Sequence, residues 1–435
     1  MKNTALIRRR ILARRASVGV LGQGYVGLTL ACIAAEAGFP VTGIDTDPAR
    51  IAQLAAGRSV VPGVLEDVFR AGTSSGRLTF TTDTGALAES DIIAICVPTP
   101  LRNEMPDLSF VEGACRDVAR NLTPSTLVIL ESTTYPGTTD GLVLPILEES
   151  GLRAGRDFLL AYSPERIDPG NQEFPPPSIP KIVGGSTPEA TGAAALFYNQ
   201  LVDKVVTVSS CRAAELAKLL ENTYRHVNIA LVNEMAILCH EMGIDVWEVI
   251  DAAATKPFGF MTFSPGPGVG GHCIPLDPTY LAWQIRREAG HQFRILEQAQ
   301  DINAQMPGYV AGRISESLNE SGKPTKAASI LVLGVAYKPD VADIRESPAV
   351  KTINHLSKRG AKVSFHDPYI SELSVNGTVL YRTELTRRAV EAADCVVILT
   401  PHRVYDLEWI AEHAQLIFDA RNAYREQRSP KVQKL

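Results

Sequence analysis

Cys273 is the residue whose surroundings most clearly favour chemistry over packing. It lies in the segment GPGVGGHCIPLDP, whereas the other six cysteines lie in apolar strand-like or helix-like stretches or in less distinctive ones. A thiol flanked by glycine can be approached closely by a substrate, and the thiolate is a strong nucleophile. His272 and Asp277 are close to it in sequence. Spacing alone leaves packing open as the other interpretation, because unpaired cysteines are often buried.

The pattern Gly22-x-Gly24-x-x-Gly27 is typical of a dinucleotide site. These glycines follow an apolar run and precede a helical pattern, so they allow a tight turn and a close approach to pyrophosphate at a helix N-terminus. Asp45 ends the next strand-like run, 18 residues after Gly27. A carboxylate there can bond ribose hydroxyls and repel a 2′-phosphate, which favours NAD over NADP, although Arg50 weakens that preference. The alternative is a glycine-rich turn that binds no nucleotide.

The elements that must position these residues predict two parallel sheets. In the first third, helical patterns such as Tyr25–Ala37 alternate with strand-like runs at Ser17–Leu21, Val41–Asp45, Asp91–Val97 and Thr126–Glu131. The last third repeats the theme at Ser329–Gly334, Lys362–Asp367, Asp394–Pro401 and Leu416–Asp419. Alternating strands and helices predict parallel sheets covered on both faces. We therefore predict an α/β chain with two Rossmann-like doubly wound domains joined by a central helical domain.

The centre of the chain is expected to be helical. Apolar residues recur at three- and four-residue spacing from Arg212 to His240 without Gly or Pro, which predicts one long helix that bridges two lobes. Further helices are expected at Asp245–Ala253, Tyr280–Ala289 and Gln292–Asn303, and loops at Asp168–Lys181 and Phe263–Pro275. The expected domains are a basic N-terminal extension (1–16), an NAD-binding domain (17–207), a central domain with the cysteine loop (208–308) and a C-terminal domain (309–435).

Bulk properties argue against several classes of protein. A net charge of −5 gives no global attraction to nucleic acid, and no stretch is long and apolar enough to span a membrane. Seven cysteines without a C-x-x-C pair favour reduced thiols, and hence a cytoplasmic location, over a disulfide framework. Five arginines between Arg8 and Arg15 precede an apolar run and imitate a signal peptide, but Gly22 and Gly24 interrupt that run. We expect a strand, turn and helix there, and one hypothesis for the arginines is a disordered tail.

Seven segments occur in an order that resembles the UDP-glucose/GDP-mannose dehydrogenase family. They are GQGYVGL, CVPTP, ESTTYPGTT, SPER, AELAKLLENTYR, GPGVGGHCIPLDP and GVAYKPDVADIRESPA, and the similarity covers the chain from about Ser17. The resemblance implies an NAD-binding domain, a helical centre used for homodimerisation and a C-terminal domain that holds a nucleotide sugar. It also implies two successive NAD-dependent oxidations, from alcohol to aldehyde to acid, with no metal.

The resemblance assigns chemistry to single positions. Cys273 is expected to form a thiohemiacetal with the aldehyde; hydride loss then gives a thioester, from which water releases the acid. Lys218 and Asn222, four residues apart on one helix, are expected to donate to the oxyanion at the sugar C6 oxygen.

The remaining implied residues position water, cofactor and substrate. Asp277 is expected to position Lys218 or a water, and Glu165 and Thr133 to orient or activate water for thioester hydrolysis. The implied cofactor-binding residues are Gly22, Gly24, Tyr25, Val26, Gly27, Asp45, Arg50, Pro98, Thr99 and Thr133. The implied substrate-binding residues are Arg166, Lys218, Asn222, Gly270, Lys338 and Arg345, of which the last two are cations that can pair with pyrophosphate.

Arg166 in the SPER segment bears on the identity of the sugar. Family members that act on glucose tend to have Phe-Leu after the Pro-Glu, whereas an arginine can bond the carbonyl of an N-acetyl group. Family members that act on the 2-acetamido mannose sugar also have Arg there, so Arg166 does not determine the configuration at C2. The resemblance of the segments SPERIDPGN, IPKIVGG, ENTYRHVNIALVNEMA and GHCIPLDP favours UDP-N-acetylglucosamine, with UDP-N-acetylmannosamine and UDP-glucose as alternatives. From a different class, a two-electron hydroxyacid-type dehydrogenase would share the Rossmann domain, the Lys and the Asn, but would yield one NADH per substrate instead of two.

Overall fold

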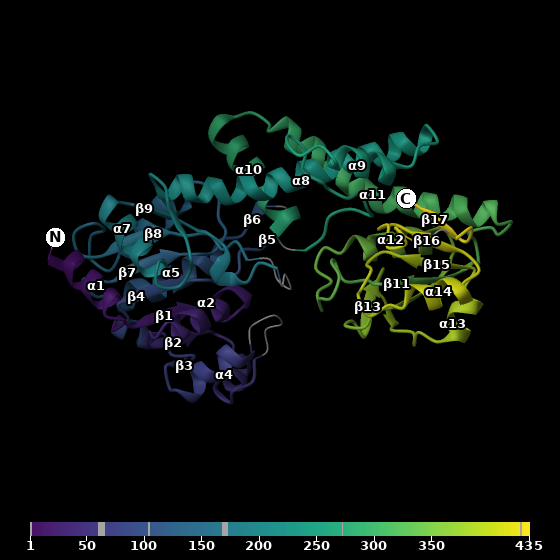
Figure 1. Cartoon of the computed structure of the whole chain (residues 1–435). Helices are drawn as coiled ribbons and strands as arrows, with labels where there is room; N and C mark the ends of the chain where they lie inside the picture. The colour runs from purple at the N-terminus through teal and green to yellow at the C-terminus, as the bar shows by residue number, and fades with distance from the viewer. Residues whose placement is uncertain (1, 60–65, 103–104, 168–172, 272, 427–428) are drawn as a thin grey trace. The chain divides into compact units, whose positions relative to one another are not determined.

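The computed structural model describes residues 2–59, 66–102, 105–167, 173–271, 273–426 and 429–435, and the chain forms two compact units (Figure 1). The first unit comprises residues 1–221 and 279–289, and the second residues 222–278 and 290–435. Helix α8 (Cys211–Glu241) begins in the first unit and ends in the second. Helix α10 (Cys273–Ala289) begins in the second unit and ends in the first.

An eight-stranded sheet forms the centre of the first unit. Its order is β10-β9-β8-β7-β4-β1-β2-β3, and β8 and β9 form its antiparallel pair. The strands are β1 (Val18–Leu21), β2 (Val41–Ile44), β3 (Leu78–Thr81), β4 (Ile92–Ile95), β7 (Leu127–Leu130), β8 (Leu159–Tyr162), β9 (Lys181–Gly185) and β10 (Val205–Thr207). Central strands such as β1, β4 and β7 are buried along their whole length, as parallel strands covered by helices on both faces must be.

Helices and short turns connect these strands. The helices are α1 (Lys2–Leu12), α2 (Tyr25–Glu36), α3 (Pro48–Ala55), α4 (Glu66–Ser74), α5 (Ser109–Asn121), α6 (Leu144–Glu148) and α7 (Pro188–Tyr198). Two 3₁₀ turns (Thr84–Glu89 and Pro176–Ser178), one π turn (Thr139–Val143) and the paired strands β5 (Leu101–Arg102) and β6 (Met105–Pro106) complete the described part of this unit.

Arg8, Arg9 and Arg10 lie on helix α1, and Arg14 and Arg15 lie in the short connection from α1 to β1, so the hypothesis of a disordered tail is wrong. Ile7 and Ile11 of α1 are 1% and 0% exposed, and α1 packs beside α7 (Figure 1). Because these isoleucines are four residues apart, one helix face enters the core while the arginines remain on the others. Arg10 also pairs with Asp91, just before β4.

A five-stranded parallel sheet forms the centre of the second unit. Its order is β12-β11-β15-β16-β17, with β11 (Ser329–Leu333), β12 (Lys362–His366), β15 (Cys395–Ile398), β16 (Ile417–Asp419) and β17 (Val432–Lys434). A separate hairpin joins β13 (Glu372–Val375) and β14 (Thr378–Tyr381). The remaining helices are α9 (Val246–Ala254), α11 (Arg294–Glu320), α12 (Pro348–Lys358), α13 (Arg387–Ala392) and α14 (Leu407–His413).

In each sheet, the strand order reverses at the strand that comes first in the chain. In the first unit β1 lies between β2 and β4, and in the second β11 lies between β12 and β15. The loops that leave β1 and β4 therefore diverge, and a ligand crevice forms outside the carboxyl ends of the strands at such a point. This architecture confirms the predicted fold class.

The structure differs from the sequence-based prediction at two proline-containing helices. The predicted loop Phe263–Pro275 is shorter, because α10 begins at Cys273 and not at Tyr280. Pro275 is tolerated there since the first turn of a helix needs no N–H donors. Part of the other predicted loop, 168–172, and His272 lie outside the described residues.

Helix α11 runs through Pro307, where the sequence predicted an end near Asn303. A proline inside a helix costs about 3 kcal/mol or more. Met306 and Val310 on either side are both fully buried, and such side chains each contribute roughly 1.5–3 kcal/mol, which offsets that cost. Among the described residues, no helix combines the length and the apolar character needed to cross a bilayer.

Candidate active site

The glycines after β1 form a turn that other residues could not adopt. Gly22 has φ +88°, and its N–H donates to the Ile44 carbonyl at 2.8 Å. A Cβ at Gly22 would lie 2.6 Å from the Cys96 carbonyl oxygen, and one at Gly27 would lie 1.8 Å from the Gly22 carbonyl oxygen. A Cβ at Gly24, the N-cap of α2, would meet no atom within 4 Å, so the space above this helix N-terminus is open. The turn therefore fits a dinucleotide pyrophosphate.

The other predicted cofactor residues lie at the same edge of the sheet. Tyr25 and Val26 are the first residues of α2; Pro98 and Thr99 follow β4, and Thr133 follows β7. The carboxyl ends of parallel strands meet at one edge, so these positions surround the glycine turn.

Two helices fix the loops that carry Thr99 and Thr133. The Thr99 carbonyl accepts a hydrogen bond from the Tyr280 hydroxyl of α10 at 3.0 Å. Glu215 of α8, which is fully buried, accepts hydrogen bonds from the N–H groups of Gly137 (2.6 Å) and Thr139 (2.9 Å). Glu215 was not predicted from the sequence. The feature that could have identified it is a carboxylate on the apolar side of the long helix.

Asp45 receives three donors at the end of β2. Its Oδ2 accepts from the Gln23 N–H (2.8 Å) and from Arg50 Nη1 (3.0 Å), and its Oδ1 from the Asp47 N–H (3.0 Å). Arg50 reaches Asp45 because α3 begins with Asp47 as N-cap and Pro48 in its first turn. A carboxylate has about four acceptor positions, so one remains for a ribose hydroxyl.

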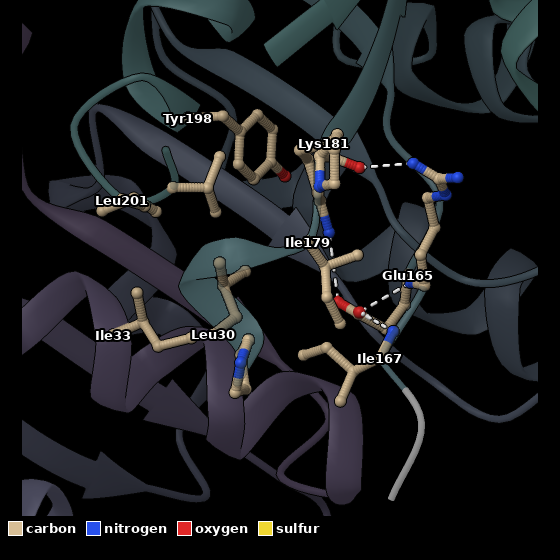
Figure 2. A pocket seen from close by; sticks show the side chains of 12 residues that line it. Leu30, Ile33, Glu165, Ile167, Ile179, Lys181, Tyr198 and Leu201 are labelled. Atoms are coloured by element: carbon tan, nitrogen blue, oxygen red, sulfur yellow. Dashed lines mark hydrogen bonds and ion pairs between the residues drawn. The ribbon is translucent and has the colours of Figure 1, made fainter. Parts of the chain in front are cut away.

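A buried ion cluster, which we call the Glu131–Lys181–Glu165 cluster, lies at the ends of β7, β8 and β9. The Lys181 ammonium is 2.8 Å from Glu131 Oε2. It is 3.1 Å from Glu165 Oε2, and Figure 2 shows this second contact. The Tyr198 hydroxyl donates to the other Glu131 oxygen. Glu131 and Lys181 were missed by the sequence analysis, which identified Glu165 alone.

The local fold explains why Lys181 meets both carboxylates. β9 is antiparallel to β8, with Tyr162 opposite Gly184, so the first residue of β9 lies beside the loop that follows β8. Glu165 then turns back on itself, with Oε1 accepting from the N–H groups of Arg166 (2.6 Å) and Ile167 (2.7 Å). Apolar side chains such as Leu30 and Ile179 line the adjoining pocket in Figure 2.

Charge and burial divide the two carboxylates of this cluster. Burial raises the pKa of Glu131 above its ordinary value, against the opposing effect of Lys181. Burial also acts on Glu165, but the Lys181 ammonium and the N–H donors of Ile167 and Arg166 outweigh it and lower its pKa. The two carboxylates raise the pKa of Lys181 despite its burial, so its ammonium stays charged. Of the two carboxylates, Glu165 is therefore the one whose surroundings favour the anionic form more strongly.

Arg166 forms a two-point ion pair with Glu221 of α8. Its Nη2 is 2.8 Å from Glu221 Oε1 and its Nε 3.2 Å from Oε2, while Nη1 donates to the Pro180 carbonyl. These contacts use three of the five N–H donors of the guanidinium group, so two can still reach a ligand.

The predicted catalytic residues of α8 and α10 are buried. Lys218 is 7%, Asn222 5% and Asp277 2% exposed. Asn222 Nδ2 donates to Asp277 Oδ2, so the structure brings these two together. Among the described residues Lys218 forms no ion pair, which is unusual for a buried lysine and typical of a functional site. The thiol of Cys273, the first residue of α10, lies outside the described part of the structure, and its catalytic role stays a prediction.

The glycine loop before Cys273 packs against the segment that follows β11. The Gly271 N–H donates to the Arg345 carbonyl at 2.9 Å. A Cβ at Gly270 would lie 2.8 Å from Pro348 Cδ and 2.9 Å from the Glu346 carbonyl oxygen. The loop therefore needs glycine for close packing as well as for access.

Lys338 and Arg345 lie in that same segment. The Lys338 ammonium is 5.8 Å from the centre of the Tyr337 ring, and Arg345 pairs with Asp343 at 2.7 Å. A residue that the sequence analysis missed, Arg421, reaches the same loop: a Cβ at Gly266 would lie 2.5 Å from Arg421 Nη1. The feature of the sequence that could have identified Arg421 is a cation two residues after Asp419, the acidic end of β16.

A buried amide chain ties the start of the glycine loop to α8 and α11. Asn233 accepts from the Gly266 N–H and donates to Asn303, both at 2.9 Å. Asn303 donates in turn to the carbonyl (3.1 Å) and Nε2 (3.3 Å) of His226. Because burial disfavours the charged imidazole, the pKa of His226 falls to about 4.

The second sheet repeats the carboxylate arrangement of the first. Asp367, directly after β12, accepts from the N–H groups of Val335 (2.8 Å) and Ala336 (3.0 Å), and from His402 Nε2 at 3.0 Å. Gly334 after β11 has φ +81°. Both units thus present a glycine turn and an acceptor carboxylate at the edge where nucleotides bind.

The chain matches the models of three domains along its length. They are the NAD-binding domain (residues 16–202), the central domain (212–305) and the UDP-binding domain (331–426) of the UDP-glucose/GDP-mannose dehydrogenase family. It is 36% identical to a UDP-N-acetyl-D-mannosamine dehydrogenase of Pyrococcus horikoshii over 94% of this chain and 96% of the relative. It is also 36% identical to a UDP-N-acetyl-D-glucosamine 6-dehydrogenase of Pseudomonas aeruginosa, over 81% and 83%. The solved structure of the Pyrococcus horikoshii UDP-D-ManNAc dehydrogenase superposes with a TM-score of 0.87, 35% identity, and coverage of 96% of this chain and 98% of that one.

Proposed function

We propose that this chain, which belongs to the UDP-glucose/GDP-mannose dehydrogenase family and is an NAD-dependent nucleotide-sugar dehydrogenase, oxidises the C6 alcohol of UDP-N-acetylglucosamine to the carboxylate through a Cys273 thioester. The observation that supports the covalent route most directly is the hydrogen bond from Asn222 to Asp277. Asp277 follows Cys273 by four residues on α10, so the helix that begins with the thiol is joined to α8, which carries Lys218 and Asn222.

In the first oxidation, the C6 hydroxyl passes its proton to a water that Asp277 positions, while Lys218 and Asn222 stabilise the negative charge on the C6 oxygen. The glycine turn after β1, with Gly22, Gly24 and Gly27, would hold NAD, which when bound would supply the hydride acceptor for both oxidations. The product of this step is an aldehyde, which cannot lose a second hydride until a nucleophile adds to its carbonyl carbon.

In the second half, the Cys273 thiolate adds to the aldehyde and forms a thiohemiacetal. Hydride loss leaves a thioester. Glu165, whose surroundings favour the anionic form, accepts a proton from water as the oxygen bonds to the thioester carbon, and cleavage of the C–S bond releases the carboxylate and restores the thiolate. Thr133 orients that water.

Arg166 supports a 2-acetamido sugar. Two of its guanidinium N–H donors remain after its bonds to Glu221 and Pro180, and an acetamido carbonyl is a matching acceptor. UDP-N-acetylmannosamine is the second candidate, because the UDP-N-acetyl-D-mannosamine dehydrogenase of Pyrococcus horikoshii is similar to this chain over 94% of its length.

A panel of nucleotide sugars tests the substrate. UDP-N-acetylglucosamine, UDP-N-acetylmannosamine, UDP-glucose and GDP-mannose are offered singly and kcat/KM is measured for each. We expect UDP-N-acetylglucosamine to exceed UDP-glucose by roughly 10- to 100-fold, the effect of one hydrogen bond to a charged group. Arg166→Leu should remove most of that difference. A wild-type preference for UDP-glucose would contradict the role of Arg166.

We also propose that two copies of the chain associate through α8. Along this helix, large apolar side chains remain exposed at four- and seven-residue spacing, at Leu216, Leu220, Tyr224, Leu231 and Leu238. A continuous apolar stripe on a helix is a usual homodimer contact. A cytoplasmic location stays a prediction.

A further inference from the structure

The Glu131–Lys181–Glu165 cluster contains more charge than a hydrolytic base requires. The Glu131 and Lys181 side chains are 0% and 8% exposed and the Glu165 side chain 14%, so the two carboxylates and the ammonium are all largely removed from water. Such buried ions are costly unless they are paired, and they occur mainly where a function needs them. The water-activating role assigned to Glu165 uses one of the three.

We propose that Lys181, anchored on Glu131, is a positioning residue that holds Glu165 anionic and in a single orientation for hydrolysis of the Cys273 thioester. This inference rests on the proposed function and deepens it. The geometry supports it at both Glu165 oxygens. Oε2 accepts from the Lys181 ammonium at 3.1 Å, and Oε1 accepts from the backbone N–H groups of Arg166 and Ile167.

Glu131 determines where the Lys181 ammonium lies. One Glu131 oxygen accepts from Lys181 at 2.8 Å, and the other accepts from the Tyr198 hydroxyl, so the carboxylate is held from both sides. Lys181 is therefore shared between two carboxylates, and Glu131 lies nearer to its ammonium than Glu165 does. Glu131 partly offsets the effect of Lys181 on the pKa of Glu165. With this second negative charge nearby, Glu165 is a stronger base than it would be in an ion pair with Lys181 alone.

The other charged and titratable groups around the cluster do not replace Lys181. Arg166 is paired with Glu221 of α8. The pKa of the Cys96 thiol after β4 is raised, first by burial and then by Glu131, so this thiol stays neutral. Burial and Glu131 likewise raise the pKa of Tyr198. Lys181 is thus the group in the described cluster whose charge acts on Glu165.

Two substitutions should shift the pH profile of hydrolysis in opposite directions. Lys181→Met leaves two buried carboxylates without a cation, so the acid limb of the hydrolysis rate should move up by about 1–2 pH units. Glu131→Gln leaves a one-to-one pair between Lys181 and Glu165, so the same limb should move down. A general loss of packing would not produce shifts of opposite sign.

The experiment follows the covalent intermediate in the full-length enzyme. Enzyme, NAD and nucleotide sugar are mixed and quenched in acid, and the intact protein mass gives the fraction that carries the sugar adduct at each time and pH. Lys181→Met should accumulate adduct below neutral pH, and Lys181→Arg should restore a profile near the wild type. Lys204→Met is the matched control, because Lys204 is exposed and neighbours Lys181 across β9 and β10.

Each outcome decides between the inference and the proposed function. If Glu165→Gln traps an adduct but Lys181→Met and Glu131→Gln leave the acid limb unmoved, or move it in the same direction, the role of Lys181 is overturned. If Lys181→Met does not fold, the absence of a downward shift in Glu131→Gln alone overturns it. If no variant, Glu165→Gln included, carries an adduct, the covalent function itself fails.

Discussion

At the scale of single residues, we propose that Asp45 selects NAD over NADP although its oxygens already accept hydrogen bonds within the protein. Three donors hold its two oxygens toward the glycine turn, and Arg50 supplies one of them. The cation reduces the local negative charge without removing the acceptor that a ribose needs.

Asp45→Asn should narrow the preference for NAD over NADP by roughly 10- to 100-fold, because a hydrogen bond to a charged group and the repulsion of a 2′-phosphate are lost together. The check is kcat/KM for both cofactors in the wild type and the variant. Arg50→Ala, which removes the cation and keeps the carboxylate, should widen the preference instead. Equal use of both cofactors by the wild type would remove Asp45 from this role.

At the scale of elements, the buried amide chain holds α8, α11 and the glycine loop together. These side chains are polar and buried, so the loss of one of them leaves its partner without a hydrogen bond and lowers the stability of the protein. His226 at its end is neutral in the folded state, with a pKa of about 4.

This histidine predicts how stability depends on pH. Its unfolded pKa is about 6.5, so between pH 6.5 and 4 the unfolded chain binds a proton that the folded chain does not, and stability falls as pH falls. At pH 5 the loss should reach about 2 kcal/mol. His226→Gln lacks this titration, so the stability difference between wild type and variant in urea unfolding should shrink by that amount from pH 7.5 to pH 5. If the difference in unfolding free energy between wild type and variant stayed constant with pH, burial would not lower the pKa of His226 in the folded protein.

The elements also show what sequence could and could not predict. Apolar periodicity located the long helix within one residue at each end, because a 31-residue helix repeats its pattern many times. It misplaced the start of α10 and the end of α11, since proline signals a break locally while burial of the flanking side chains decides the outcome.

The candidate site divides in the same way. Residues within ordered motifs, such as Gly22, Lys218 and Asp277, were identifiable from the chain. Lys181 was not, because its function depends on the antiparallel pairing of β9 with β8, which brings it beside Glu165 from 16 residues away. A lone lysine at the start of an apolar run gives no sign of such a partner.

At the scale of the whole molecule, the exposed stripe of α8 predicts a dimer. The full chain should have twice the monomer mass in light scattering at micromolar concentration. Leu220→Glu with Leu231→Glu should raise the dimer dissociation constant by roughly 100-fold or more, as loss of central apolar contacts does. Arg225→Glu, an exposed polar position on the same helix, is the control and should leave the mass unchanged. A wild type that is monomeric throughout would contradict the proposed contact.

The measurement that tests the account most directly is the yield of NADH per mole of nucleotide sugar consumed, with the sugar limiting and NAD in excess. A four-electron oxidation through a thioester predicts two NADH and one carboxylate for each sugar. Cys273→Ser should yield no carboxylate while its binding of NAD is retained, since the aldehyde then has no thiolate to add. A yield of one NADH per sugar in the wild type would contradict the four-electron mechanism and indicate a two-electron dehydrogenase. Normal carboxylate formation by Cys273→Ser would contradict the thioester route.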